Sequence, residues 1–281
     1  MGAAFKEFWG RYRRRGSAVL GLVLLILILA VAAIGPWLVP PDPWDLVARP
    51  FLWPGEDREF PLGSDNLGRD ILTGLVHGSR VSLLVGFTAM AAALGIGVTI
   101  GAVAGYMGGL VDDVLMRITE VFQTIPTFLL AIVLVAIFKP SIVTIVLAIS
   151  AVTWPSIARL VRSEFLSLRS REFVQSCIVI GMSEPRIIFG QILPNCLAPV
   201  IVMASVLMAG AILTESGLSF LGLGDPNLMS WGTMIGIGRD AMRTAWYISA
   251  IPGVAILITV LALNLVAEGI NDALNPRLKY R

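Results

Sequence analysis

Long runs of apolar residues dominate the sequence, with short polar segments between them. Six of these runs contain at most one charged residue, and each is close to the length of about twenty residues that a helix needs to cross a bilayer. The runs cover residues 16–41, 81–111, 118–138, 141–158, 187–214 and 244–267. This pattern predicts an all-α membrane protein with six transmembrane helices.

The composition supports a membrane protein. Of the 281 residues, 56% are hydrophobic and 14% are charged, and the mean hydropathy is +0.83. Soluble domains carry about 25% charged residues. The two cysteines, Cys177 and Cys196, match neither a disulfide framework nor a metal-binding spacing, so we interpret them as small apolar residues. We predict no metal site.

Charge in the flanking segments predicts the orientation. Segments on the cytoplasmic side of a membrane carry an excess of lysine and arginine. The loop over residues 42–80 holds seven acidic residues and four arginines. Basic residues instead gather in the N-terminal tail, in the loop after the fourth run and in the C-terminal tail: Lys6, Arg11, Arg13, Arg14, Arg15, Arg159, Arg162, Arg169, Arg171, Arg186, Arg277, Lys279 and Arg281. Both termini are therefore predicted to be cytoplasmic.

These elements predict the domain organisation. A basic tail (residues 1–15) and a first transmembrane helix (residues 16–40) precede an extracytoplasmic loop (residues 41–78). A five-helix transmembrane domain follows (residues 79–270), with a cytoplasmic loop at residues 159–194, and a cytoplasmic tail (residues 271–281) ends the chain. The first run lacks the small-residue cleavage site of a signal peptide, so we predict that it is retained as a helix.

Small residues recur at every fourth position in the second run: Ala89, Ala93, Gly97, Gly101 and Gly105. Such spacing lets another helix approach closely in the membrane. It predicts a packing seam against a neighbouring helix or a partner permease, although the general abundance of glycine is an alternative. Prolines inside the runs, at Pro126, Pro155, Pro199 and Pro252, predict bends. The aromatic residues Trp37, Trp53, Trp154, Trp231, Trp246 and Tyr247 are interpreted as an interfacial belt.

Catalytic chemistry is not predicted. The sequence has no P-loop motif, no Gly-Lys pair, and only one histidine from which to assemble a catalytic triad. Acidic residues inside membrane segments are usually functional. Glu120 and Glu268 are interpreted as interfacial anchors or ion-pair members, and Arg117 lies one turn before Glu120. Glu215 is the candidate for a cavity or gate role, with Arg239 and Arg243 as its expected partners.

The polar segment between the fourth and fifth runs is the main functional candidate. It predicts two short helices, with Gly181 permitting the turn between them and Pro185 supporting the start of the second. Its spacing resembles the coupling loop (EAA motif) of permease subunits in ABC importers, in which a fixed glycine precedes a proline by thirteen residues. Gly181 and Pro194 have this separation.

Two further stretches resemble the C-type permease of the dipeptide/oligopeptide/nickel importer family. The first covers residues 60–72 (FPLGSDNLGRDIL) and 78–86 (GSRVSLLVG). The second covers residues 217–224 (GLSFLGLG) and 230–232 (SWG), and the chain closes with NPRL at residues 275–278. The resemblance extends over nearly the whole chain and implies the type I ABC importer permease fold.

The chain departs from the family at the motif itself. Gln175, Ser176 and Cys177 stand where the family has Glu-Ala-Ala. Small residues are kept at two positions, but the acid is lost, and Glu172 lies one turn earlier. The resemblance assigns coupling to Glu172, Gln175, Ser176, Cys177, Gly181, Glu184 and Pro194.

The resemblance also implies the partners. These are a homologous second permease, two ABC ATP-binding subunits that carry ATP and Mg, and an extracytoplasmic solute-binding protein, around a subunit that sits in lipid, binds no cofactor and contacts no nucleic acid. The expected location is a bacterial or archaeal plasma membrane. The loop over residues 42–77 is then a docking surface for the solute-binding protein or the partner permease, although local turn capping by Asp65 and Asp70 is an equal alternative. Peptides are the expected cargo, and nickel or another small solute, a secondary transporter and a membrane scaffold stay open.

Overall fold

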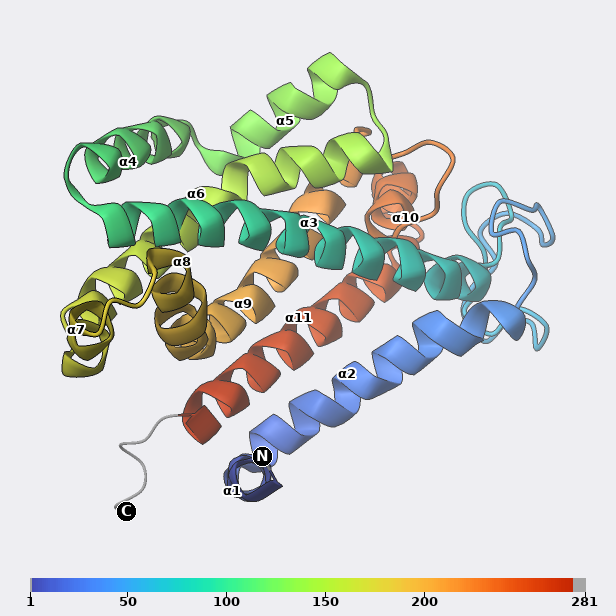
Figure 1. Cartoon of the computed structure of the whole chain (residues 1–281). Helices are drawn as coiled ribbons and strands as arrows, with labels where there is room; N and C mark the ends of the chain where they lie inside the picture. Colours follow the sequence, from blue (N-terminus) through green and yellow to red (C-terminus); the bar gives the residue numbers. More distant parts are fainter. Residues whose placement is uncertain (1, 275–281) are drawn as a thin grey trace.

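The computed structural model of the chain describes residues 2–274. These residues form helices joined by loops (Figure 1). The α-helices are α1 (Gly2–Arg14), α2 (Gly16–Ile34), α3 (Ile71–Met107), α4 (Gly109–Thr124), α5 (Thr127–Phe138), α6 (Ile142–Arg169), α7 (Glu172–Val179), α8 (Glu184–Ile187), α9 (Leu193–Phe220), α10 (Trp231–Gly238) and α11 (Tyr247–Leu274). Short 3₁₀ turns occupy Gly35–Trp37 and Arg239–Ala241, and a π-helical turn at Ile188–Ile192 joins α8 to α9.

Five helical stretches in the described residues are long and apolar enough to cross a membrane. They are Gly16–Trp37, Ile71–Met107, Ile142–Arg169, Glu184–Phe220 and Tyr247–Leu274. Five of the six predicted spans therefore correspond to single helical stretches. The NPRL motif at residues 275–278 and most of the predicted C-terminal tail lie outside the described residues.

The third predicted span is not one helix. Residues 118–138 divide between α4 and α5, whose axes differ in direction by 84°. The cause is Pro126, which has no N–H to donate and disfavours helical geometry in the residue before it. Ile125 is accordingly extended, with φ −92° and ψ 132°. Because α5 has only 12 residues, or about 18 Å of helix, it is too short to cross the bilayer alone, and the bent pair α4–α5 is either a broken span or a re-entrant loop.

Helix α3 begins at Ile71, eight residues before the predicted start of the five-helix domain at residue 79. The side chain of Asp70 accepts hydrogen bonds from the backbone N–H groups of Leu72 and Thr73 and caps α3. Asp65 accepts two further backbone N–H groups, from Leu67 and Arg69. Local capping therefore accounts for these two carboxylates.

The packing seam predicted from the small residues forms, and its partner is α6. All five residues of the ladder are buried: Ala89, Ala93, Gly97, Gly101 and Gly105. A Cβ atom at Gly97 would lie 2.5 Å from Cβ of Ile157, and one at Gly105 would lie 2.6 Å from Cβ of Phe165. In Figure 1, α3 crosses the centre of the molecule over α6. The two helices form the centre of the bundle, against which α9 also packs.

The aromatic belt is only partly present. Trp37, Trp53 and Trp246 are exposed. Trp154 is instead buried against Phe122, and Trp231 is buried with its indole N–H donating to the carbonyl of Leu75 at 2.9 Å. Tyr247 is also buried. The interfacial interpretation was wrong for these three residues, because other parts of the chain cover their rings.

Candidate coupling and transport site

The α7–α8 segment, residues 172–187, projects beyond the end of α6 as two short helices (Figure 1). Gly181 lies between them with φ +77°. In this left-handed conformation its N–H donates to the carbonyl of Ile178, and the N–H of Met182 donates to the carbonyl of Cys177. Such a turn ends a helix and favours glycine. The predicted helix–turn–helix is therefore present, and Pro185 stands in the first turn of α8 as predicted.

Three apolar side chains attach this segment to the bundle. Val174 on α7, Ile187 on α8 and Ile192 on the π-helical turn are all buried in one cluster with Phe165 of α6. Cys196 is buried in the same cluster, as expected of a small apolar residue. The α7–α8 segment is thus packed on the bundle, so a force applied to it reaches α6 and α9 through side-chain contacts.

Six of the seven predicted coupling residues lie on this segment, and Pro194 lies at the start of α9. Gln175 occupies the position of the lost acid. Its side-chain amide donates a hydrogen bond of 3.0 Å to the carbonyl of Arg169, the last residue of α6. Cys177 is half-buried, and the other residues assigned to coupling are exposed: Glu172, Gln175, Ser176, Gly181, Glu184 and Pro194. Glu172 and Ser176 are one turn apart, and the Ser176 hydroxyl donates to the carbonyl of Glu172.

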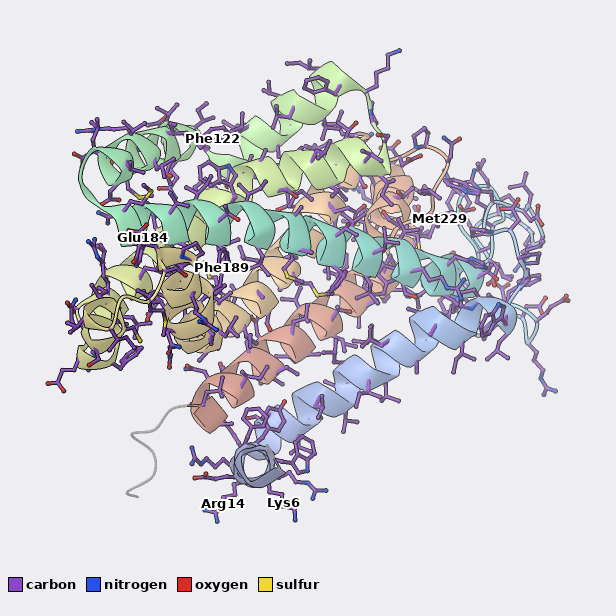
Figure 2. All side chains as sticks on the ribbon, viewed as in Figure 1. Lys6, Arg14, Phe122, Glu184, Phe189 and Met229 are labelled. Carbon is purple, nitrogen blue, oxygen red and sulfur yellow. The ribbon has the colours of Figure 1, made fainter. Side chains whose placement is uncertain are left out.

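Sequence reasoning missed an apolar ridge at the tip of α7, formed by Val179 and Ile180. Their side chains are 85% and 73% exposed. Phe189, labelled in Figure 2, is also exposed beside α8. The available signal was two β-branched residues directly before the turn glycine, where they cannot reach the core. An exposed apolar ridge on a polar element is typical of an interaction surface.

An ion pair that sequence reasoning treated only as flanking charge fixes α4 to α6. Arg162 donates through Nη2 to Oδ2 of Asp112 at 2.6 Å and through Nε to Oδ1 at 2.5 Å. Asp112 lies in the first turn of α4 and is buried. Nearby, the Arg169 guanidinium lies 5.6 Å from the ring centroid of Tyr106. Tyr106, Arg169 and Glu184 line an open cavity of about 490 Å³ between the end of α3 and the α7–α8 segment.

Glu215, the gate candidate, is buried near the end of α9 and is held by serines. Its Oε1 accepts hydrogen bonds from the hydroxyls of Ser219 and Ser230, both at 2.7 Å. The expected ion pairs with Arg239 and Arg243 do not form in the described structure, because Arg239 pairs with Asp240 and Arg243 is exposed. Glu215 therefore ties the end of α9 to the start of α10.

Ser230 extends this hydrogen-bond network to a further helix. Its hydroxyl also accepts from the N–H of Thr233 and caps α10. The next residue, Trp231, donates its backbone N–H to Ser82 of α3. One polar network thus joins α3, α9 and α10. The other two acids, interpreted as interfacial anchors or ion-pair members, both form ion pairs. Glu120 pairs with Arg117, the neighbour noted in the sequence, and Glu268 pairs with Arg15, a partner that the sequence did not indicate.

Glu215→Ala is expected to destabilise the chain by about 2 kcal/mol, because two buried hydroxyls lose their acceptor. Glu215→Gln keeps an acceptor oxygen and should recover most of that loss. Thermal unfolding of the purified chain in detergent would measure both variants. Equal midpoints for Glu215→Ala and the natural chain would contradict a structural role for this network.

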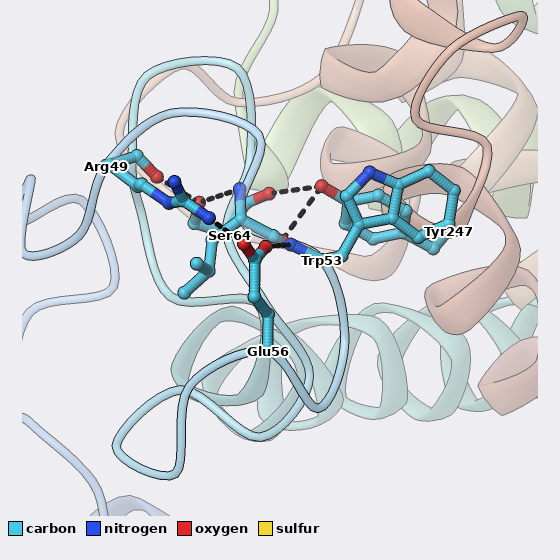
Figure 3. A network of polar contacts seen from close by, with 6 residues as sticks. Arg49, Trp53, Glu56, Ser64 and Tyr247 are labelled. Carbon is cyan, nitrogen blue, oxygen red and sulfur yellow. Dashed lines mark hydrogen bonds and ion pairs between the residues drawn. The ribbon is translucent and has the colours of Figure 1, made fainter.

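The loop between α2 and α3 folds over one end of the bundle and is fastened to α11 (Figure 3). The Tyr247 hydroxyl donates to the carbonyl of Leu52 at 2.9 Å, and Trp53 lies 4.9 Å from the Tyr247 ring. Glu56 accepts from the N–H of Trp53 and pairs with Arg49, and both contacts lower the pKa of its carboxyl. The loop is therefore a folded surface with a defined shape.

Two protein-family models match the chain. Residues 97–280 match the model described as binding-protein-dependent transport system inner membrane component. Residues 4–54 match the N-terminal TM domain of oligopeptide transport permease C. The second match covers most of α1, all of α2 and the first part of the loop that follows it.

Relatives extend the similarity to almost the full length. The chain is 38% identical to the di/tripeptide transport system permease protein DppC of Pseudomonas aeruginosa, over 98% of this chain and 92% of the relative. It is 42% identical to the dipeptide transport system permease protein DppC of Escherichia coli K12, over 98% and 93%. A solved chain of the MetNI methionine ABC transporter, in inward-facing form, has a TM-score of 0.59 and 17% identity, over 72% of this chain and 96% of that chain. The chain belongs to the family of binding-protein-dependent transport system inner membrane components, the non-catalytic permease subunits of ABC transporters.

Proposed function

We propose that this chain forms half of the translocation path of an ATP-driven importer for di- and oligopeptides. The observation that carries the proposal is the α7–α8 segment, which places an exposed apolar ridge on an element packed against α6 and α9. The peptide cargo is supported by the near-full-length similarity to dipeptide and di/tripeptide permeases. As a permease of an ABC transporter, the chain works with ATPase subunits.

The ATPases are proposed to act through the α7–α8 segment. Val179 and Ile180 would insert into the ATPase surface, while Glu172 and Glu184 supply charge beside them. Movement of the segment would pass through Val174, Ile187 and Ile192 into the bundle. The chain itself would bind no nucleotide, and the ATP and Mg would lie in the partner subunits.

The remaining partners follow from the same architecture. A homologous second permease would complete the path, and an extracytoplasmic solute-binding protein would deliver the peptide to the folded loop between α2 and α3. This arrangement requires both termini and the α7–α8 segment on the cytoplasmic side, as the charge distribution favours. Labelling of the exposed Ser183→Cys variant with a membrane-impermeant thiol reagent in intact cells tests the orientation, and reaction from outside would contradict it.

Uptake of radiolabelled dipeptide into proteoliposomes that contain the complete complex tests the cargo. We expect uptake that requires ATP and the solute-binding protein, and that an excess of unlabelled tripeptide inhibits. ATP-dependent uptake of nickel without peptide uptake would contradict the proposed peptide cargo but would not contradict the proposed coupling through the α7–α8 segment.

Val179→Asp/Ile180→Asp is expected to weaken retention of the ATPase subunits at least 100-fold, because two carboxylates would be buried at an apolar contact. Co-purification with tagged ATPase subunits measures this. Leu46→Asp/Val47→Asp is the matched control, since it also adds two carboxylates at exposed apolar residues, but in the loop between α2 and α3. Undiminished co-purification of Val179→Asp/Ile180→Asp would exclude the ridge as the docking site.

A further inference from the structure

Helix α1 lies across the ends of α2 and α11. Figure 1 shows α1 along its axis while α2 runs across the picture, so the two helices meet at a steep angle. Only Arg15 separates α1 from the membrane-spanning α2, which begins at Gly16. A helix that turns sharply at the start of a span lies along the membrane surface, at the level of the lipid headgroups.

The aromatic side chains of α1 are already occupied by the bundle. Tyr12 is buried and donates its hydroxyl to the carbonyl of Ala18 at 3.0 Å. Trp9 stacks on Tyr12 with ring centroids 5.7 Å apart, and Phe8 packs on the same cluster. Gly269 of α11 leaves room for the Tyr12 ring, since a Cβ there would lie 2.6 Å from its Cε2. This face of α1 is therefore held by protein contacts.

The carboxylates near α1 are also occupied. Glu7 pairs with Arg11, and both Asp272 and Glu268 of α11 pair with Arg15. Arg11 additionally donates to the carbonyl of Ala273. These contacts neutralise two of the five cations of α1 and its junction with α2.

Three cations remain without a carboxylate partner in the described part of the chain: Lys6, Arg13 and Arg14. All three are exposed. Figure 2 shows Lys6 and Arg14 pointing away from the bundle. The Arg13 guanidinium lies 5.3 Å from the Trp9 ring, a contact that leaves its N–H groups available. The result is a basic face on α1, directly before the candidate membrane span that begins at Gly16.

We propose that this basic face binds the phosphates of anionic phospholipids. Lys6, Arg13 and Arg14 would supply the charge, and Tyr12, Trp9 and the Arg15 ion pairs would hold α1 in place. A headgroup fits better than a protein partner because α1 continues directly into α2, so any cation on it lies beside lipid. Each lysine or arginine at an anionic membrane surface strengthens binding about fivefold. The inference does not depend on the cargo.

The test is lipid binding to the purified full-length chain, counted by native mass spectrometry. The probes are phosphatidylglycerol and phosphatidylcholine with identical acyl chains. We expect phosphatidylglycerol to bind more tightly, and Lys6→Gln/Arg14→Gln to weaken its tightest binding about 25-fold without affecting phosphatidylcholine. Adding Arg13→Gln should bring the loss to the order of 100-fold.

Lys139→Gln/Arg243→Gln is the matched control, because it removes one exposed lysine and one exposed arginine far from α1. It should leave phosphatidylglycerol binding unchanged. Unchanged phosphatidylglycerol binding by Lys6→Gln/Arg14→Gln, or an equal loss in the control, would overturn the proposal. So would weaker co-purification of the ATPase subunits with normal lipid binding, which would assign the basic face to a protein partner.

Discussion

Substitution of Gly181 by tryptophan is expected to abolish ATP-driven uptake while the chain still inserts into the membrane. Gly181 has φ +77°, a conformation that costs other residues roughly 1–2 kcal/mol. No atom outside the local chain lies within 4 Å of a Cβ placed there, so the side chain would project outward. On the proposed mechanism it projects into the ATPase interface, and Gly181→Asp would add an unpaired charge at the same point.

The Gly181→Asn variant separates the cost of the left-handed backbone conformation from the effect of a bulky side chain at the ATPase interface. Asparagine tolerates the left-handed conformation better than other side chains and is small, so uptake should fall far less than with tryptophan. Dipeptide uptake would be compared at equal membrane abundance of the variants. Normal uptake by Gly181→Trp would remove the α7–α8 segment from the coupling path.

Gly97→Leu is expected to prevent stable folding of the chain. The Cβ atom alone would lie 2.5 Å from Cβ of Ile157 and 2.8 Å from the carbonyl oxygen of Trp154. Both neighbours belong to the middle of α6, so relief requires α3 and α6 to separate along the whole seam. Overpacking usually costs about 1–3 kcal/mol, and a clash with backbone puts this site at or above the upper end.

Gly95→Leu is the control, two residues away on the same helix. Gly95 is exposed, and a Cβ at this position would have no atom of another segment within 4 Å, so its substitution should leave the midpoint of thermal unfolding nearly unchanged. Comparing the two variants in detergent isolates the seam from helix propensity and hydrophobicity. Equal stability of Gly97→Leu and Gly95→Leu would show that close approach of α3 and α6 is not required.

The sequence predicted local structure at positions where few residue types suit the required backbone conformation or packing. Gly181 and Pro185 predicted the turn and the second helix start, since a left-handed turn and a fixed φ suit these residue types. The ladder in α3 predicted a seam, because small residues at helical spacing can serve close packing. The capping roles of Asp65 and Asp70 were open alternatives that the structure confirms.

Other features could not be read in this way, because they depend on contacts between distant segments. The Glu215 carboxylate was expected to pair with arginine, but the fold brings Ser230, fifteen residues away, within 2.7 Å. The bond from Arg162 to Asp112 joins residues fifty positions apart. Neither pairing has a sequence spacing that distinguishes it from other pairs of charged or polar residues.

Hydropathy alone determined that this is a helical membrane protein, because every span must satisfy its own backbone and present apolar side chains. The resemblance of its motifs to a permease family was equally independent of coordinates. Only the tertiary structure decided that α6 fills the α3 seam, that the bend predicted at Pro126 reaches 84°, and that Val179 and Ile180 face outward. The reason is that an apolar pattern shows which side chains are kept from water. It does not show whether lipid, a neighbouring helix or a partner protein covers them.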